Sequence, residues 1–324
     1  MNIGILGAGF MGSTHLKCYL KNNYCGVRYI FDQNLSKAKA LGDEYGIAAT
    51  DDIKLLTGSG VDAVDICLPT FLHREFVEIA ARAKKHILCE KPMALSEKEC
   101  NEIIDLINEN QVFYMVAHVL RFWPEYVYIK KITDLEELGK PVYATASRLQ
   151  PIPAWSENNW MVNPKLSCGG IVDLQIHDLD YVAWLFGIPK SIKSVGAQSV
   201  HGAWEQVITV MEHETGVKSC IEACNLMPQG YPFTARFKII YRDGCIEYDC
   251  NREHTVTVYR KGEPPEYPDF KGQDGYQNEI DYFVDCIVNH QAGHMVPLED
   301  ARNALRLALK TKQSIETQEV VTFF

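Results

Sequence analysis

The sequence predicts an α/β protein in which a doubly wound parallel sheet precedes an α+β domain with a mostly antiparallel, open sheet. In the first third of the 324 residues, short apolar runs alternate with helical apolar spacing, which is typical of parallel sheets with crossover helices. From Pro141 onward, strand-like runs follow one another, and one long helix interrupts them. A chain of this length favours two domains, which we place at residues 1–120 and 121–324.

The first domain alternates strands and helices. Five apolar runs are predicted strands: Asn2 to Leu6, Val27 to Phe31, Ala63 to Leu68, Ile87 to Cys89 and Val112 to Ala117. Four stretches between them are predicted helices: Phe10 to Leu20, Ser36 to Tyr45, His73 to Ala83 and Ser96 to Asn108. Because crossovers between parallel strands are right-handed, this order predicts a sheet with helices on both faces.

The second domain changes to successive strands. Runs from Pro141 to Leu149 and from Ser191 to Val258 are separated by turn signals, so we expect mostly antiparallel pairing. Two further helical stretches, Tyr276 to Val288 and Leu298 to Ser314, close the chain and could pack across the domain junction.

Composition and charge exclude several classes of partner. The formal charge of −10 would repel nucleic acid and anionic membranes, so a small-molecule partner is favoured. Met1 leads almost directly into the apolar run Ile3 to Leu6, and no apolar run approaches about 20 residues, so neither a signal peptide nor a membrane span is expected. Eleven cysteines without a C-x-x-C pair are typical of reduced thiols in the cytoplasm, and no metal site is expected.

A glycine-rich loop follows the first strand and opens a helix. It has the sequence G-A-G-F-M-G, and this context makes the G-x-G-x-x-G pattern a dinucleotide-binding signal of the Rossmann type. Gly7 permits the tight turn, Gly9 lets the main chain approach a pyrophosphate, and Gly12 allows close contact between helix and strand. The amides and dipole at the helix N-terminus favour negative charge there.

The second strand ends in Phe31-Asp32, about twenty residues beyond the loop. A carboxylate at this position accepts hydrogen bonds from the adenine-side ribose and would repel a 2′-phosphate. No arginine follows in Gln33-Asn34-Leu35, so the sequence favours NAD over NADP. The alternative interpretation is a glycine turn beside a surface aspartate.

Three side chains form a candidate catalytic set. Lys91 ends a predicted strand and would project at the carboxyl edge of the sheet, beside the crevice where dinucleotides lie. Asp173 and His177 begin the long helix and, being four apart, lie on one face with Cβ atoms about 5 to 6 Å apart. Oxidising an alcohol needs a base that titrates near neutrality, which suits His177, while Lys91 would stabilise the alkoxide and Asp173 would orient the substrate or the histidine. The alternatives are a solvated lysine, a helix N-terminal carboxylate and a partly buried histidine.

These motifs resemble the Gfo/Idh/MocA family of oxidoreductases over nearly the whole chain. The similar motifs are the glycine loop, Glu90-Lys91-Pro92 and the helix start Gly169-Gly170-x-x-Asp173-x-x-x-His177. The resemblance implies a dinucleotide-binding Rossmann domain, a C-terminal domain that binds substrate and forms oligomers through an open sheet, and a catalytic set made of Lys91, Asp173 and His177. One departure concerns the substrate: Trp160-Met161 stands where the family often has Trp-Arg.

Further site residues follow from the same comparison and from position. The expected cofactor contacts are Gly7, Gly9, Phe10, Met11, Gly12, Asp32, Pro69, Thr70, His73, Glu90 and Lys91. For His73 alone, a helix-start role without a ligand is the alternative. The candidate substrate contacts are His118, Arg121, Arg148, Trp155 and Trp160, with packing as an equal alternative for each.

The sequence therefore predicts a cytoplasmic NAD-dependent dehydrogenase that acts on a CH–OH group of a sugar, sugar derivative or inositol. A homodimer or homotetramer is expected. Two alternatives stay open: a glycoside hydrolase or lyase of the same fold that uses NAD transiently, and a non-catalytic sensor that binds NAD.

Overall fold

The computed structural model describes residues 1–152, 160, 163–164, 166–167, 169–272 and 274–324, which form two compact units. Unit 1 comprises Met1–Phe122 and Gln273–Arg302, and unit 2 comprises Trp123–Gly272 and Asn303–Phe324. The chain thus returns to unit 1 after unit 2 is largely built, so a segment late in the sequence helps to form the dinucleotide-binding unit.

Unit 1 is built on a six-stranded parallel sheet with the order β3-β2-β1-β4-β5-β6. Its strands are β1 (Asn2–Leu6), β2 (Gly26–Phe31), β3 (Ala48–Thr50), β4 (Ala63–Ile66), β5 (His86–Glu90) and β6 (Tyr114–Ala117). The doubly wound sheet and its five predicted strands are confirmed. The sequence missed β3 because three residues at a sheet edge are too few to show a period.

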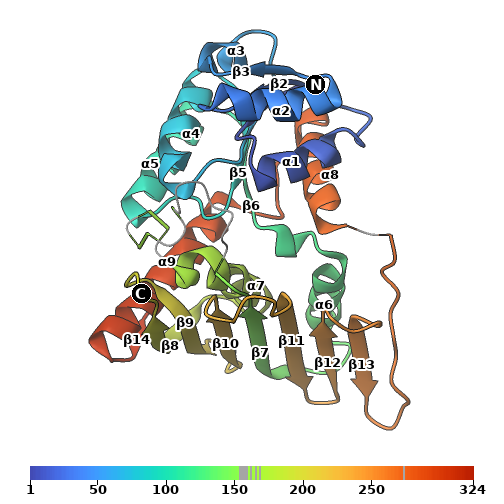
Figure 1. Cartoon of the computed structure of the whole chain (residues 1–324). Helices are drawn as coiled ribbons and strands as arrows, with labels where there is room; N and C mark the ends of the chain where they lie inside the picture. The colour runs from blue at the N-terminus through green and yellow to red at the C-terminus, as the bar shows by residue number, and fades with distance from the viewer. Residues whose placement is uncertain (153–159, 161–162, 165, 168, 273) are drawn as a thin grey trace. The chain divides into compact units, whose positions relative to one another are not determined.

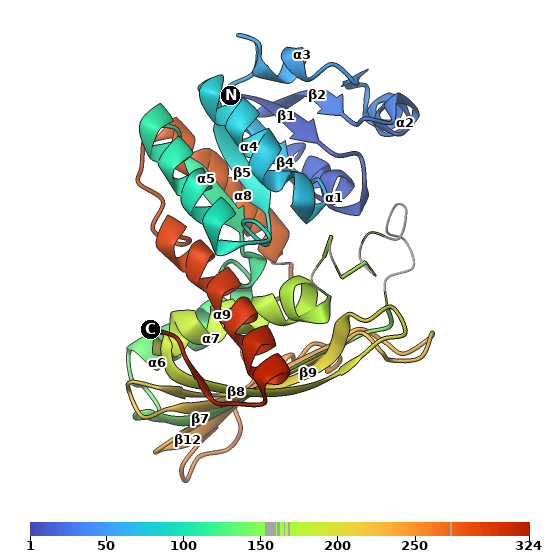
Figure 2. The same ribbon diagram turned by 90° about the vertical axis from the view of Figure 1, so that its left-hand side faces the viewer.

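Helices cover both faces of this sheet (Figures 1 and 2). They are α1 (Phe10–Tyr19), α2 (Leu35–Tyr45), α3 (Ile53–Thr57), α4 (His73–Arg82), α5 (Glu97–Asn110) and α8 (Gly275–Val288). Helices α4 and α5 pack together on one face, and α1 packs against α8 on the other. Helix α5 begins with a capping box, in which the Glu99 amide donates to Ser96 Oγ at 3.2 Å and Ser96 Oγ donates to the Glu99 carboxylate at 2.9 Å.

The central strands β1, β4 and β5 of unit 1 are buried along almost their whole length, as expected for a parallel sheet with helices on both faces. Such strands are normally continuous apolar runs. Asp65 in the middle of β4 is an exception, because its side chain is completely buried. A buried carboxylate needs a partner, and the partners of Asp65 lie next to the candidate site.

Unit 2 contains an eight-stranded sheet with the order β13-β12-β11-β7-β10-β9-β8-β14. The strands are β7 (Pro141–Leu149), β8 (Pro189–Gln198), β9 (Trp204–His213), β10 (Lys218–Cys224), β11 (Thr234–Tyr241), β12 (Gly244–Asp249), β13 (Val256–Arg260) and β14 (Val321–Thr322). Only the pair β7 and β10 is parallel among these strands, so the mostly antiparallel sheet is confirmed.

The helices of unit 2 lie on one face of its sheet (Figures 1 and 2). They are α6 (Pro124–Asp134), a π-helix η4 (Ile171–Gln175), α7 (Ile176–Phe186) and the second part of α9 (Leu298–Thr317). The sequence missed α6, which contains the run Tyr126 to Ile129 of aromatic and β-branched residues that favour strands. Its burial against Tyr181 and Phe237 overrides that preference.

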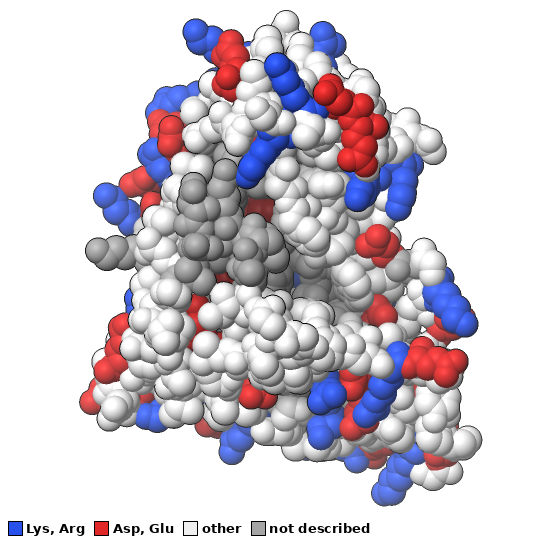
Figure 3. All heavy atoms as spheres, in the orientation of Figure 1, with Lys and Arg blue, Asp and Glu red and all other residues white. Residues whose placement is uncertain are grey.

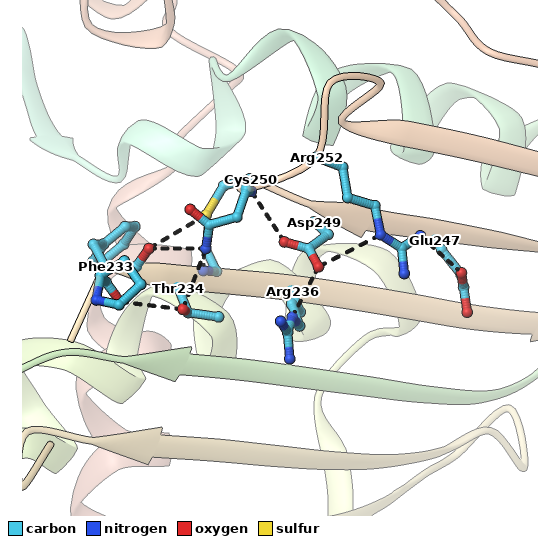
Figure 4. Close-up of polar contacts among 10 residues, drawn as sticks. Phe233, Thr234, Arg236, Glu247, Asp249, Cys250 and Arg252 are labelled. Carbon is cyan, nitrogen blue, oxygen red and sulfur yellow. Dashed lines mark hydrogen bonds and ion pairs between the residues drawn. The ribbon is translucent and has the colours of Figure 1, made fainter.

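The opposite face of this sheet carries no helix in the described part of unit 2. Ile208 and Val210 of β9 project from it and are 37% and 46% exposed. Near β11 and β12 the face is charged: Arg236 Nε lies 2.9 Å from the Asp249 carboxylate, and Arg252 lies between Asp249 and Glu247 (Figure 4). The expected open sheet is therefore present, with an apolar part and a polar part.

Charged side chains of both signs are interspersed on the face drawn in Figure 3. The net negative charge is therefore spread over this surface and not gathered in one field. Among the described residues, no helix combines the length and apolar composition that crossing a membrane requires.

Candidate active site and cofactor site

The glycine loop between β1 and α1 has the geometry that a dinucleotide requires. Gly7 has φ +105°, and a Cβ atom there would lie 2.5 Å from the Cys67 carbonyl oxygen. A Cβ atom on Gly12 would lie 1.8 Å from the Gly7 carbonyl oxygen. A Cβ atom on Gly9 would meet nothing within 4 Å. Gly7 and Gly12 are thus required by the protein's own packing, whereas Gly9 keeps open space at the N-terminus of α1, where a pyrophosphate would approach.

Asp32 follows β2 directly and lies beside this loop. One of its carboxylate oxygens accepts from the Ala8 amide at 3.0 Å, and the other accepts from the Asn34 amide at 2.8 Å. The two hydrogen bonds hold the carboxylate at the carboxyl edge of the sheet. The loop, the helix N-terminus and Asp32 together fit the pyrophosphate and ribose of NAD.

The segment after β4 contains three more expected cofactor contacts. Pro69 and Thr70 begin the 3-10 turn η1 (Thr70–Leu72), and Thr70 is buried. His73 starts α4 and is fully buried, with its ring nitrogens 2.8 Å from the Leu68 carbonyl oxygen and 2.9 Å from the Pro92 carbonyl oxygen. His73 therefore joins the segments after β4 and β5, a geometry that favours the structural alternative for this residue.

Glu90 and Lys91 stand at the carboxyl end of β5, as the sequence predicts. Lys91 is half-buried, and its amide donates to the Glu90 carboxylate at 3.0 Å. The other oxygen of Glu90 lies 3.4 Å from Nε2 of His15 on α1. Nδ1 of His15 in turn lies 2.9 Å from the Asp65 carboxylate. Sequence reasoning missed His15 and Asp65, although an aspartate within the apolar run of β4 was a signal.

Burial and neighbouring charge alter the proton affinity of this group. Burial by itself would lower the pKa of His15, but the charge and hydrogen bond of Asp65, with Glu90 and Glu279, raise it to about 9. Burial raises the pKa of Glu90, partly opposed by His15 and Lys91. Burial also raises the pKa of Glu279 on α8 well above its usual range. Each of these three groups therefore keeps its proton to a higher pH than an exposed group of the same kind.

In unit 2, Asp173 and His177 lie on the first turns of the η4–α7 helix. Both side chains are half-buried, whereas Leu174, Gln175 and Ile176 between them are buried. The helix begins as a π-helix and continues as an α-helix from Ile176. π-helical turns are frequent at functional sites.

The glycines before this helix are explained by close packing against β9. Gly169 has φ +72°, and a Cβ atom there would lie 3.0 Å from the Trp204 carbonyl oxygen. A Cβ atom on Gly170 would lie 3.0 Å from the carboxylate of Glu205, which accepts from the Asn225 amide at 2.8 Å. Burial raises the pKa of Glu205, and the hydrogen bonds of Asn225 and of the Gly170 main chain oppose this. Sequence reasoning missed Glu205 and Asn225, which support the start of the helix that carries Asp173.

Family models match both parts of the chain. The model described as "Oxidoreductase family, NAD-binding Rossmann fold" matches residues 1–118, and the model described as "GFO/IDH/MocA C-terminal domain" matches residues 126–247. This chain belongs to the Gfo/Idh/MocA family. The family predicted from the three motifs is therefore confirmed, together with its NAD-binding Rossmann domain.

Several characterised proteins are similar to this Gfo/Idh/MocA oxidoreductase. A scyllo-inositol 2-dehydrogenase (NAD(+)) of Bacillus subtilis is 29% identical over 88% of this chain and 85% of its own length. A UDP-N-acetylglucosamine 3-dehydrogenase of Acidithiobacillus ferrooxidans is 27% identical over 98% of this chain and 97% of its own. The solved structure of that enzyme has a TM-score of 0.85, at 26% identity and 98% coverage of both chains. A 2,7-anhydro-N-acetylneuraminate hydratase of Mediterraneibacter gnavus is 29% identical over 61% of this chain and 52% of its own.

Among the candidate substrate contacts of this Gfo/Idh/MocA chain, two arginines have strong partners within their own unit. Arg121 is buried, and its guanidinium donates to the Met295 carbonyl oxygen and to the Asp300 carboxylate, both at 2.8 Å. Arg148 is buried and makes a bidentate pair with Asp178. These contacts favour the packing alternative for both residues. His118 is buried, Trp160 is half-buried, and Trp155 and Met161 lie outside the described residues.

Proposed function

We propose that this oxidoreductase is an NAD-dependent dehydrogenase that transfers hydride between nicotinamide and a carbinol carbon of a sugar, sugar derivative or inositol. The observation that carries the proposal is the open space at Gly9, with the Asp32 carboxylate held beside the same loop. Membership of a family of NAD-binding oxidoreductases supports it.

The residues of unit 1 would bind and orient the cofactor. The amides at the start of α1 favour the pyrophosphate, and Asp32 would accept hydrogen bonds from the adenine-side ribose. Asp32 would also repel a 2′-phosphate, which favours NAD over NADP. When bound, NAD supplies the acceptor or donor of the hydride.

The proton would move at His177. In the oxidation direction His177 accepts the hydroxyl proton of the substrate while the carbon–oxygen bond becomes a carbonyl, and in reduction it returns that proton. The ammonium group of Lys91 stabilises the negative charge that develops on the same oxygen, and Asp173 orients the substrate or the imidazole. The proposal requires that Lys91 and His177 act on one substrate molecule.

The names of the relatives support a polyhydroxylated substrate. The Bacillus subtilis enzyme acts on scyllo-inositol, and the Acidithiobacillus ferrooxidans enzyme acts on UDP-N-acetylglucosamine. At 27% to 29% identity these names indicate the substrate class, and we propose no single member of it.

The test measures NADH absorbance with a panel of inositols, sugars and sugar nucleotides. We expect wild type to reduce NAD with at least one of them, and Lys91→Ala and His177→Asn each to lower kcat/KM by at least about 100-fold. Lys98→Ala is the matched control, because its side chain is 87% exposed on α5. Equal turnover by wild type and Lys91→Ala would remove the proposed role of Lys91.

A second candidate is a lyase or hydrolase reaction in which NAD is used transiently. The hydratase among the relatives favours this alternative. Product analysis separates the two functions: a cleaved or hydrated product without net NADH supports the second candidate, and stoichiometric NADH supports the dehydrogenase.

We also propose that the protein forms homo-oligomers through the helix-free face of the sheet in unit 2, and that it works in the cytoplasm. The exposed Ile208 and Val210 support the first statement, since association would cover them. The free thiols of all ten described cysteines support the second. Ile208→Glu should convert a dimer or tetramer to smaller species in light scattering, and a protein that is monomeric before the substitution contradicts the proposal.

A further inference from the structure

A buried group of charged side chains lies beneath the carboxyl edge of the sheet in unit 1. We call it the His15 cluster: His15 on α1, Asp65 on β4, Glu90 on β5 and Glu279 on α8. His15, Asp65 and Glu279 are completely buried, and Glu90 is 8% exposed. Three carboxylates thus share one imidazole in a place that water does not reach, which is costly unless each group has a specific task or a proton.

The contacts within the His15 cluster form a chain that ends at Lys91. The Asp65 carboxylate lies 2.9 Å from Nδ1 of His15 and thereby orients the ring. Nε2 of His15 then lies 3.4 Å from one oxygen of Glu90, and the other oxygen of Glu90 accepts from the Lys91 amide at 3.0 Å. Glu90 therefore has two contacts: an ion-pair contact with the His15 imidazole, whose Nε2 has no hydrogen-bond partner among the described residues, and a hydrogen bond from the main chain of Lys91.

The other neighbours of His15 do not replace these contacts. Cys67 Sγ lies 3.5 Å from Nδ1 of His15 and 3.4 Å from the Asp65 carboxylate, and the ring of Tyr276 packs at 6.3 Å between centroids. Glu279 faces the cluster from α8, and neither of its carboxyl oxygens has a hydrogen-bond partner among the described residues. Glu90 is the member of the cluster that contacts the main chain of Lys91, and its carboxyl group also interacts with the charge of Lys91.

We propose that His15 and Asp65 are positioning residues, which hold the Glu90 carboxylate and, through it, the main chain and the electrostatic surroundings of Lys91. The inference rests on the proposed function, in which Lys91 stabilises the reacting oxygen. If Lys91 moves by a small distance because Glu90 no longer holds its main chain, its ammonium group stabilises the reacting oxygen much less. This stabilisation depends on preorganised geometry. Glu90 then has a second role beside its expected contact with the cofactor, which is to position Lys91.

The first experiment is a double-mutant cycle. The variants are His15→Asn, Glu90→Gln and the double variant, with His86→Asn as the matched control. His86 lies at the opposite end of β5, where its Nδ1 accepts from the Phe113 amide at 2.9 Å. We expect His15→Asn and Glu90→Gln each to lower kcat at least about tenfold, and in His15→Asn, which changes no expected cofactor contact, the Kd for NADH should change less than about threefold. The double variant should be no slower than the slower single variant, because both changes break one chain.

The second experiment needs neither cofactor nor substrate. Lysines of the full-length protein are labelled by reductive ¹³C-methylation, and the Lys91 resonance is assigned by its absence in Lys91→Arg. We expect this resonance to move in His15→Asn and Glu90→Gln and to stay unchanged in His86→Asn. If His15→Asn does not fold, Glu90→Asp takes its place, because a shorter side chain cannot keep both contacts of Glu90.

The outcomes separate this inference from the proposed function. Additive losses in the double variant, or an unchanged Lys91 resonance in His15→Asn, overturn the positioning role. Equal losses of NADH binding and kcat would indicate a merely structural role and also overturn it. If Lys91→Ala turns over like wild type while the resonance still moves, the positioning role holds and the proposed role of Lys91 fails.

Discussion

Both units bury charged side chains, but they balance the charges differently. In unit 2, Arg148 Nε and an NH2 group donate to the two oxygens of Asp178 at 2.8 and 3.0 Å, and the same NH2 group donates to Tyr126 Oη at 3.3 Å. One cation meets one anion, and their geometry is bidentate. In the His15 cluster of unit 1, one imidazole contacts Asp65 and Glu90 and also feels the charge of Glu279, which has no hydrogen-bond partner in the described part of the chain.

The difference teaches what each group can do. In the matched pair, the Arg148 guanidinium keeps its charge, because arginine does not release its proton in proteins. An unmatched cluster must take up protons, so its charge depends on pH and on its neighbours. The first arrangement stabilises one conformation, and the second can influence a nearby reacting group.

The largest expected effect comes from breaking the matched pair. Arg148→Ala leaves the carboxylate of Asp178 buried and unpaired, so we expect the free energy of unfolding to fall by about 3 to 5 kcal/mol. Urea unfolding measures the loss. The double variant Arg148→Met/Asp178→Leu should recover most of it, and a double variant as unstable as Arg148→Ala would contradict this explanation.

The next effect depends on pH. The pKa of His15 is raised to about 9 in the folded protein, above its usual value, so its stabilising effect is complete below about pH 6.5 and is lost as the pH rises through 9. We expect His15→Asn to lower the free energy of unfolding by up to about 3 kcal/mol at pH 6 and by much less at pH 9.5. Urea unfolding at both pH values checks this. The same loss at both would show that His15 does not titrate with the cluster.

Glu279→Gln should raise the stability of the protein, whereas His15→Asn should lower it. Because burial raises the pKa of Glu279, the folded protein binds the proton more tightly than the unfolded chain, and stability falls as the pH rises above about 4.5. Glutamine keeps the shape and cannot ionise, so we expect the variant to be more stable than wild type by at least about 1 kcal/mol at pH 8 and equal to it near pH 4.5. The melting temperature measures the gain, with the exposed Glu109→Gln as control. If Glu279→Gln melts at a lower temperature than wild type at pH 8, the carboxyl group of Glu279 makes a stabilising contact, and the explanation by burial of an unpaired group is contradicted.

The smallest effect is expected on the helix-free sheet face. Arg252 is 51% exposed and lies 3.3 Å from Glu247, so water screens the pair. Arg252→Ala should change the free energy of unfolding by less than about 1 kcal/mol, and 0.5 M salt should remove most of the change. If Arg252→Ala lowers the free energy of unfolding as much as Arg148→Ala does, burial does not explain the difference between the Arg252–Glu247 and Arg148–Asp178 ion pairs.

Much of the fold could be predicted because its signals are local. Apolar runs and helical spacing identified five strands of unit 1, and the order of strands and helices indicated the doubly wound sheet. The packing agrees with the need for glycine at Gly7 and Gly12, where a Cβ atom would collide with main chain, whereas a Cβ atom at Gly9 would meet nothing within 4 Å. The strand β3 and the helix α6 were missed, since a three-residue edge strand has no period and packing overrode the strand preference of α6.

The sequence by itself determined the family and the glycine-rich loop, because these depend on residue type and short spacing along the chain, and on the same grounds it predicts the catalytic set Lys91, Asp173 and His177. Only the tertiary structure decided that Arg148 pairs with Asp178 and that His15 meets Asp65, Glu90 and Glu279. The physical reason is distance along the chain: His15 and Asp65 are 50 residues apart, and helix α8 comes from the far end of the sequence. Hydrophobic periodicity shows which side chains are buried, but the partner that a buried charge finds is settled only when the elements pack.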